Sequence, residues 1–336
     1  MVPNSATAAS GLRTYYYDPE GSLHVDLSLD EIRAARDEPH GLLWADVSAD
    51  GREEGERVLR DIFDFHPLTI DDCYNTLIDP PKVDDYGRYL FVIVHDVHYD
   101  ERTHVLTTRE LNVYIGTNYV VSVHRAPVHA VDDVCRRADA HSLVLQSGAA
   151  FLAHALIDVV VDDFHPVVEQ FDDEVAELEE RVLDDPRRET LEAVLRLKRN
   201  AQRLKRSILP QRDVMNRFSR NEYPHLVQPH AIMYFRDIYD HTVRVEEMID
   251  SVRDLGDSAL STYLSSVNNR INEVMKALAV VAVVFLPLTL IASIYGTNFH
   301  RTFPEYDWAP GFAGMIASML VTMAALFGYF RWRKWF

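Results

Sequence analysis

The chain has 336 residues, of which 47% are hydrophobic and 26% charged, and its formal net charge is −18 at pH 7. A surface this acidic is repelled by phosphate backbones and excludes a nucleic-acid-binding protein. It raises the local concentration of cations instead, unless the charge serves solubility alone. The only two cysteines, Cys73 and Cys135, exclude a disulfide framework and a zinc ribbon.

The first 145 residues are predicted to form an α/β domain. Because the N-terminus lacks a basic start followed by an apolar stretch, no signal peptide is expected and the domain should stay in the cytoplasm. Gly116-Thr117-Asn118 is predicted to be a hairpin turn. Segments rich in Val, Ile, Tyr and Phe predict strands at residues 43–47, 89–99, 106–115 and 119–124, and helices are expected at 29–36, 55–63 and 67–75.

Some residues of this domain have metal-binding side chains, but each also has a structural interpretation. His95 and His98 lie three apart on a predicted strand, so they should point to opposite faces as surface or interface residues. Asp71 and Asp72 are interpreted as charges in the first turn of a helix, where they complement the helix dipole.

A helical hairpin is predicted next. Its first helix, residues 151–183, is dense in Asp and Glu, and its second, residues 189–218, carries a basic patch. The two helices are expected to pack antiparallel and to form salt bridges with each other. Pro166 and Pro210 fall inside them, so each helix should be kinked or broken at its proline.

One very long helix is predicted to follow. Apolar residues recur every three or four positions from Ile232 to Ile271, and the pattern runs directly into an uncharged apolar stretch at residues 277–295. The simplest interpretation is a single helix of about 65 residues, roughly 100 Å long. A stripe of this length needs partner helices, so the chain is expected to form a homo-oligomer.

Two apolar runs near the C-terminus, residues 277–295 and 309–330, are long enough to cross a hydrocarbon core of about 30 Å. Lys276 precedes the first run, and Arg331 follows the second. The positive-inside rule therefore places both termini in the cytoplasm and the connecting loop outside the cell membrane. The alternative is a pair of buried core helices in a soluble protein.

The sequence thus predicts an α+β multi-domain membrane protein, with a cytoplasmic α/β domain and a helical stalk that continues into the first of two transmembrane helices. The predicted segments are residues 1–145 (α/β domain), 146–228 (acidic and basic hairpin), 229–276 (stalk), 277–298 (first span), 299–308 (external loop), 309–330 (second span) and 331–336 (basic tail).

The register of the stalk gives the first span one distinctive face. This face is polar at its cytoplasmic end, apolar in the middle, and polar again toward the external loop. Such an order suits an ion pore, in which an apolar constriction gates by dewetting and polar rings handle the ion with its water. Ordinary helix packing through small and hydroxyl residues is the alternative. The residues are Asn272, Met275, Leu278, Ala282, Leu286, Thr289 and Ser293.

The sequence Tyr295-Gly296-Thr297-Asn298-Phe299, preceded by the run from Phe285 to Thr289, resembles the signature of the CorA magnesium channel family. The resemblance extends upstream through the segment from Tyr234 to His241 and covers most of the chain. The family's usual tripeptide is Gly-Met-Asn, and here Thr297 stands in place of Met. The related ZntB-like branch also varies this residue. The family is therefore retained, while the choice among Mg²⁺, Zn²⁺, Co²⁺ and Ni²⁺ stays open.

The resemblance implies a homopentamer that carries divalent cations across the lipid bilayer and is not an enzyme. Gly296, Thr297 and Asn298 would form the selectivity filter, and the polar and apolar face described above would line the pore. Glu305 and Asp307 in the external loop would concentrate cations at its mouth. No prosthetic group is implied, because the cation is both substrate and regulatory ligand.

The resemblance also implies a sensor. A divalent ion held between neighbouring subunits would bridge Asp237 on the stalk to Asp100 on the α/β domain, and its binding would close the pore. The alternatives that remain are a zinc, cobalt or nickel transporter of the same fold, possibly proton-coupled, a membrane-tethered metalloenzyme, and a scaffold with a two-span anchor.

Overall fold

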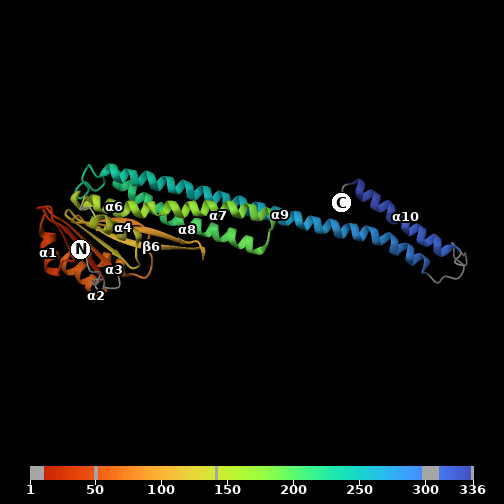
Figure 1. Cartoon of the computed structure of the whole chain (residues 1–336), viewed down its shortest axis with the longest axis horizontal. Helices are drawn as coiled ribbons and strands as arrows, with labels where there is room; N and C mark the ends of the chain where they lie inside the picture. Colours follow the sequence, from red (N-terminus) through yellow and green to blue (C-terminus); the bar gives the residue numbers. More distant parts are fainter. Residues whose placement is uncertain (1–10, 49–51, 141–142, 297–309, 334–336) are drawn as a thin grey trace. The chain divides into compact units, whose positions relative to one another are not determined.

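The computed structural model describes residues 11–48, 52–140, 143–296 and 310–333 (Figure 1). It contains a mixed sheet, helices on both faces of that sheet, and two long apolar helices near the C-terminus. The elements in chain order are β1 (Leu12–Tyr17), β2 (Leu23–Val25), α1 (Leu29–Asp37), β3 (Leu42–Ser48), α2 (Arg52–Arg57), the π-helical turn η2 (Val58–Ile62), α3 (Pro67–Tyr74), β4 (Lys82–Asp85), β5 (Leu90–Asp100), β6 (Val105–Ile115), β7 (Tyr119–His124), α4 (His129–Ala140), α5 (Leu143–Gln146), α6 (Ala149–Asp162), α7 (Phe164–Asp184), α8 (Arg188–Ser219), α9 (Ile232–Tyr295) and α10 (Gly311–Trp332).

The sheet has seven strands in the order β2-β1-β3-β7-β6-β5-β4. Strands β3 and β7 are parallel, and the other neighbours are antiparallel. The predicted hairpin between β6 and β7 is confirmed, with Ile115 opposite Val120. A Cβ on Gly116 would lie 2.4 Å from the ring of Tyr119, so only glycine fits at this turn.

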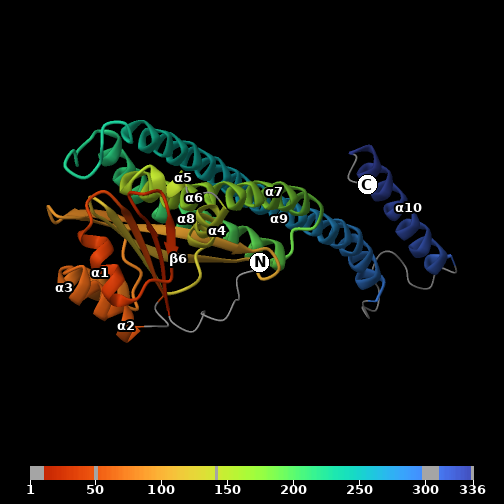
Figure 2. The same ribbon diagram turned by 60° about the vertical axis from the view of Figure 1, so that its left-hand side comes forward.

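Each face of the sheet has its own apolar core. On one face Phe91 and Tyr114 pack against residues of α1, η2 and α3. On the other face Trp44, Val92 and Val113 pack against α4 and α6 and against parts of α8 and α9 (Figure 2). Central strands covered on both sides read as continuous apolar runs, which explains why the sequence predicted them. The short strands β1, β2 and β4 lack such a run, and they were missed.

Two interpretations of residues in this domain are wrong. His95 was expected at a surface or interface, but it is 6% exposed, and its Nε2 lies 2.7 Å from the carbonyl oxygen of Asp79. The backbone N–H of His95 donates to Gln211 on α8, which covers this part of β5. The predicted opposite orientation of His98 is confirmed, because His98 is exposed.

The expected dipole role of Asp71 and Asp72 is also wrong. Helix α3 begins at Pro67, and its first turn holds no acidic residue. The two aspartates lie in the second half of this eight-residue helix, where the dipole disfavours a negative charge. Asp72 is compensated by Lys82, whose Nζ lies 2.8 Å from its carboxylate.

The predicted acidic helical segment is interrupted, as expected from Pro166. Helix α6 ends at Asp162 and α7 begins at Phe164, so Pro166 falls in the first turn of α7, where a missing N–H costs nothing. Helix α8, by contrast, continues through Pro210 without a break.

The salt bridges expected between the acidic and basic helices are largely formed with a different partner. Arg196 on α8 faces Glu174 on α7 at 3.8 Å. Three basic side chains of α8, spaced seven residues apart, pair with acidic residues of α9 instead. They are Lys198 with Asp257, Lys205 with Asp250 at 2.6 Å, and Arg212 with Glu246 at 2.5 Å. Helix α9 lies against α8, so its acidic residues pair with the basic side chains of α8 that were expected to pair with α7.

The chain divides into two compact units, residues Met1–Arg181 with Arg188–Leu260, and residues Val182–Arg187 with Ser261–Phe336. The first unit holds the sheet, its covering helices and the first part of α9. The second holds the apolar part of α9 and α10. The predicted fold class, an α/β domain followed by one long helix and a second apolar helix, is confirmed.

Candidate ion pathway and cation site

Helix α9 presents the predicted pore face in one continuous register. Its 64 residues include all seven predicted pore-lining positions from Asn272 to Ser293. At about 100° per residue these positions fall within an arc of about 120°. All seven side chains are exposed in the single chain, including Met275, Leu278 and Leu286 at 59%, 60% and 72%. The face is therefore free to meet other copies or water.

The C-terminal end of this face gathers polar backbone groups. Pro287 has no N–H, so the carbonyl of Val283 loses its helical donor. The hydroxyl of Thr289 donates to the carbonyl of Phe285 at 2.8 Å. The helix ends at Tyr295, and the N–H of Gly296 donates to Ala292 at 2.9 Å. Thr297 and Asn298, together with Glu305 and Asp307 of the predicted loop, lie outside the described residues.

Both predicted spans are helices of sufficient length and hydropathy to cross a membrane. The most apolar window of α9 has a mean hydropathy of 2.7, and that of α10 a mean hydropathy of 1.8. Neither window is buried inside the protein. Core helices of a soluble protein would be covered, so the soluble alternative is contradicted.

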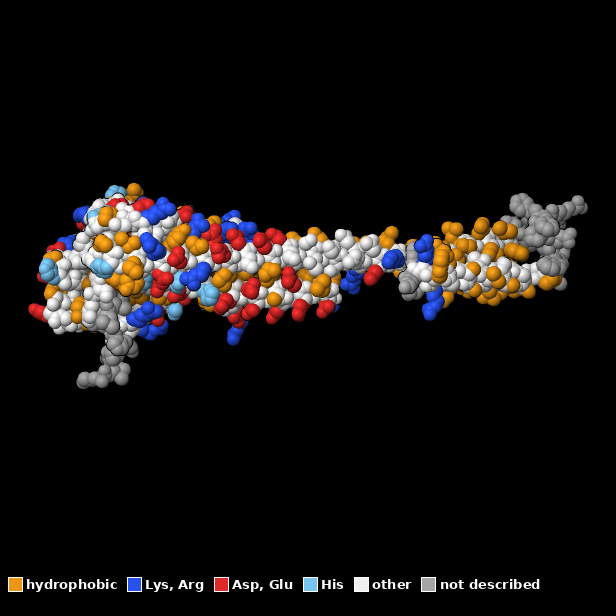
Figure 3. All heavy atoms as spheres, turned by 90° about the horizontal axis from the view of Figure 1, so that it is seen from above, with side chains coloured by type: hydrophobic (Ala, Val, Ile, Leu, Met, Phe, Trp, Pro, Cys, Tyr) orange, Lys and Arg blue, Asp and Glu red, His pale blue; other side chains and the backbone are white. Residues whose placement is uncertain are grey.

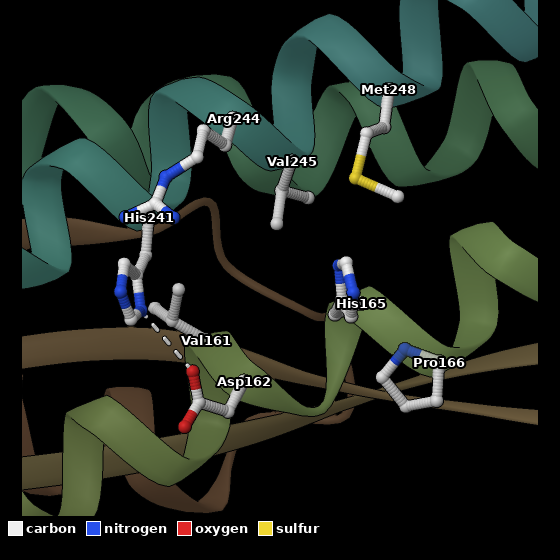
Figure 4. A pocket seen from close by; sticks show the side chains of 8 residues that line it. All are labelled: Val161, Asp162, His165, Pro166, His241, Arg244, Val245 and Met248. Atoms are coloured by element: carbon white, nitrogen blue, oxygen red, sulfur yellow. Dashed lines mark hydrogen bonds and ion pairs between the residues drawn. The ribbon is translucent and has the colours of Figure 1, made fainter.

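The unit that holds the α/β domain contains a cluster of three potential cation ligands. Asp158 and Asp162 stand one turn apart on α6, and His241 faces them from α9. One ligand atom from each lies within 4.8 Å of the others. Nδ1 of His241 is 3.3 Å from the carboxylate of Asp162, along the dashed line in Figure 4. Among the described residues, this is the only group of three or more such ligands.

Asp237, the predicted stalk ligand, lies at the margin of this cluster. It is one turn before His241 on α9, its carboxylate is 3.8 Å from Nε2 of that histidine, and its side chain is 66% exposed. Burial raises the pKa of Asp158, and burial lowers the pKa of the neighbouring His154. The cluster therefore combines a half-buried carboxylate with ligands that face solvent, which suits an exchangeable cation.

Asp100 is not a member of this cluster within one chain. It is the last residue of β5, and its carboxylate accepts hydrogen bonds from the N–H of Arg102 and the hydroxyl of Thr103, both at 2.9 Å. These bonds lower the pKa of Asp100 and hold the turn to β6. To bind a cation held by another copy, the Asp100 carboxylate would have to give up these hydrogen bonds within the turn.

A cavity of about 350 Å³ opens beside the cluster (Figure 4). His241, Arg244, Val245 and Met248 of α9 form one side, and Asp162 of α6 with His165 and Pro166 of α7 form the other. A second cavity of about 500 Å³ shares Met248 and is bordered by acidic residues of α7. A shallow, partly acidic surface therefore runs between α7 and α9.

Sequence reasoning found Asp237 but missed the other members of the cluster. Asp158 and Asp162 were read only as part of an acidic helix. Two signals were present, since Asp158 and Asp162, and likewise Asp237 and His241, are each four residues apart on one helix face. Nothing local indicates that the two pairs meet, because Asp162 and His241 are 79 residues apart.

Comparisons with known proteins agree with this arrangement. The model of a family described as "CorA-like Mg2+ transporter protein" matches residues 39–333. The cobalt/magnesium transport protein CorA of Thermotoga maritima is 34% identical over 87% of this chain and 83% of its own length. A putative metal ion transporter of Bacillus subtilis, YfjQ, is 30% identical over 92% and 95%. The solved CorA magnesium transporter of Methanocaldococcus jannaschii has a TM-score of 0.82 at 22% identity, covering 95% and 97%, which shows the fold.

Proposed function

The chain belongs to the CorA-like Mg²⁺ transporter family of divalent cation transporters, and we propose that it carries Mg²⁺ into the cell down its electrochemical gradient. The observation that carries this proposal is the exposed face of α9, which is polar at both ends and apolar between. For a divalent ion the membrane potential supplies about 4.6 kcal/mol per 100 mV, twice the value for one charge. No prosthetic group and no enzymatic step are needed.

The pore requires several copies of the chain. Two spans per chain cannot enclose a channel, so the first spans of several copies, five in this proposal, surround it. Gly296, Thr297 and Asn298 form the outer ring that receives the ion, with Glu305 and Asp307 nearby to attract it. Mg²⁺ releases its water reluctantly, so amide and carbonyl groups contact its hydration shell. Met275, Leu278, Ala282 and Leu286 form the apolar gate, with Thr289 and Ser293 above it and Asn272 at the exit. Both termini lie in the cytoplasm.

A cation sensor in the α/β unit regulates the pore. Asp237 binds a divalent ion between neighbouring copies, with Asp100 of the next copy as its partner. The cluster of Asp158, Asp162 and His241 supports this proposal, because it places further ligands beside Asp237. Acidic surfaces repel each other until a cation neutralises them. An occupied site therefore holds the subunits together and favours the closed pore.

A zinc, cobalt or nickel transporter of the same fold, possibly proton-coupled, is the second candidate. Two observations favour it. Thr297 stands where the family has Met, and His241 offers a nitrogen ligand, which transition metals accept more readily than Mg²⁺ does.

Uptake into liposomes that contain the purified protein separates the two candidates. With an inside-negative potential and no pH gradient, we expect Mg²⁺ uptake that increases with the potential and needs no proton movement. Empty liposomes and liposomes with the potential collapsed are the controls. The second candidate would be established instead if Zn²⁺, Co²⁺ or Ni²⁺ is taken up and Mg²⁺ is not, or if uptake occurs only under a pH gradient.

A further inference from the structure

Helices α7 and α8 display opposite charges that the single chain does not neutralise. The outward side of α7 carries five exposed acidic residues, opposite its buried face of Phe171, Val175 and Leu178. Figure 3 shows acidic side chains gathered along the helical part of one face of the molecule. The five residues are Glu169, Asp172, Asp173, Glu177 and Glu180. Within the described residues, only Glu169 has an ion-pair partner, the exposed His165 at 3.2 Å.

The basic residues of α8 divide into two sets. Lys198, Lys205 and Arg212 are paired with α9, as described above. Arg199, Arg203 and Arg206 are exposed and form no ion pair with any residue that the structure describes. These three guanidinium groups are four and three residues apart on one helix face, where like charges destabilise each other. The stripe of three arginines therefore destabilises the helix unless a partner supplies negative charge.

The acidic side of α7 has the same spacing. Asp173, Glu177 and Glu180 are four and three residues apart, which gives rungs about 6 and 4.5 Å apart along the axis, equal to those of the arginine stripe. The complementary groups therefore match in charge and in repeat. Among the described residues neither set pairs with the other, and α8 meets α7 through Arg196 and Glu174 at 3.8 Å instead.

We propose that the acidic side of α7 in one copy docks on Arg199, Arg203 and Arg206 of α8 in the next copy. The inference rests on the proposed function, which requires several copies around one pore. A closed ring of more than two copies needs two different complementary surfaces on each chain. These two sides of the helical hairpin supply them. Mg²⁺ ions are a competing occupant of α7, but they leave the arginines of α8 without a partner.

Charge reversal of the full-length protein in detergent tests the contact. The variants are Asp173→Arg with Glu177→Arg and Glu180→Arg, Arg199→Glu with Arg203→Glu and Arg206→Glu, and all six changes together. Each triple variant should raise the protein concentration at half-dissociation by at least about tenfold at low salt, and the six-fold swap should restore assembly. The matched control is Glu20→Arg with Glu53→Arg and Asp61→Arg, three exposed acidic residues outside both sides, which should assemble normally.

Disulfide formation between copies gives a second readout that does not depend on stability. Differently tagged Glu177→Cys and Arg203→Cys proteins are co-expressed and oxidised. A disulfide that joins both tags can only connect two copies. The natural thiols of Cys73 and Cys135 are 1% and 5% exposed and do not compete. We expect the mixed product to form, and to be lost when Glu53→Cys, on the exposed surface of α2, replaces Glu177→Cys.

The outcomes separate this contact from the proposed function. If neither triple variant weakens assembly, or the six-fold swap fails to restore it, the contact is wrong. If these variants still transport Mg²⁺ in liposomes, the proposed function stands without it. If the unmodified protein is monomeric and transports no cation, the proposed function fails as well. If reversal on α8 reduces binding to anionic lipid vesicles and leaves assembly unchanged, the stripe binds lipid, and the proposal is overturned.

Discussion

We expect the replacement of Asn298 with alanine to abolish cation uptake while the oligomer remains intact. The proposed outer ring contains one Asn298 amide from each copy, and these groups contact the hydration shell of the ion. If each amide contributes about 1 kcal/mol, a ring of five contributes about 5 kcal/mol. Since about 1.4 kcal/mol corresponds to a factor of ten in rate, we expect uptake to fall by more than a thousandfold.

Uptake into liposomes and the mass of the detergent-solubilised oligomer are measured on the same preparation. Asn269→Ala is the matched control, because Asn269 is an exposed asparagine of α9 that lies off the pore face. This control should transport normally. Normal uptake by Asn298→Ala would remove Asn298 from the filter, and dissociation of the variant would assign Asn298 to assembly instead.

Replacing Asp237 with lysine removes the response of the current to cytoplasmic Mg²⁺. The lysine ammonium supplies permanently the positive charge that a bound cation supplies reversibly, so cation binding no longer distinguishes open from closed states. Coupling between sites is typically 5- to 150-fold in affinity, and we expect a loss of about this size. Currents from reconstituted bilayers are recorded against Mg²⁺ on the cytoplasmic side.

Asp240→Lys is the control, because Asp240 is an exposed aspartate on the same helix, three residues away. It should keep the wild-type response. A response unchanged in Asp237→Lys would contradict the sensor assignment. Asp100→Asn is tested in parallel to identify the second partner. The amide removes the negative charge but keeps an oxygen that can accept from the N–H of Arg102, so a weakened Mg²⁺ response would assign Asp100 to the cation and an unchanged response would assign it to the turn.

The sensor should also depend on pH. Burial raises the pKa of Asp158, and a carboxylate must be deprotonated to bind a cation. The response to Mg²⁺ is therefore complete above this raised pKa and weakens as the pH falls through it, earlier than for an ordinary aspartate. Asp158→Asn should show a weaker response with this pH dependence removed, measured in the same bilayer recordings.

The sequence predicted most of the architecture because several elements carry a signal along the whole of their length. Strand β5 begins with the buried apolar run Leu90–Val94, and β6 ends with the buried segment Leu111–Ile115. Helix α9 keeps one apolar periodicity from Ile232 to Ile271 and becomes uncharged and apolar from residue 277, which predicted a continuous helix. The motif around Gly296 and Asn298 supplied the family, which periodicity alone could not.

What the sequence did not predict depends on contacts between distant segments. The basic residues of α8 were expected to pair with α7. Lys205 instead pairs with Asp250, 45 residues away, because α9 packs along α8. The strand pattern predicted a surface position for His95, but in the folded chain Gln211 of α8 accepts a hydrogen bond from the N–H of His95 and α8 covers it. The ligands around Asp237 come together only when α6 and α9 are side by side.

The most direct test of the central claim, that one face of α9 lines the ion pathway, is a cysteine scan of the first span. Single cysteines replace Ala282, Leu286, Thr289 and Ser293 on the proposed pore face, and Val284, Leu288 and Ile291 on the opposite side. A charged, water-soluble thiol reagent is then added during Mg²⁺ uptake into liposomes. We expect block at the first set and no effect at the second. Equal block at both sets, or block at neither, would contradict it.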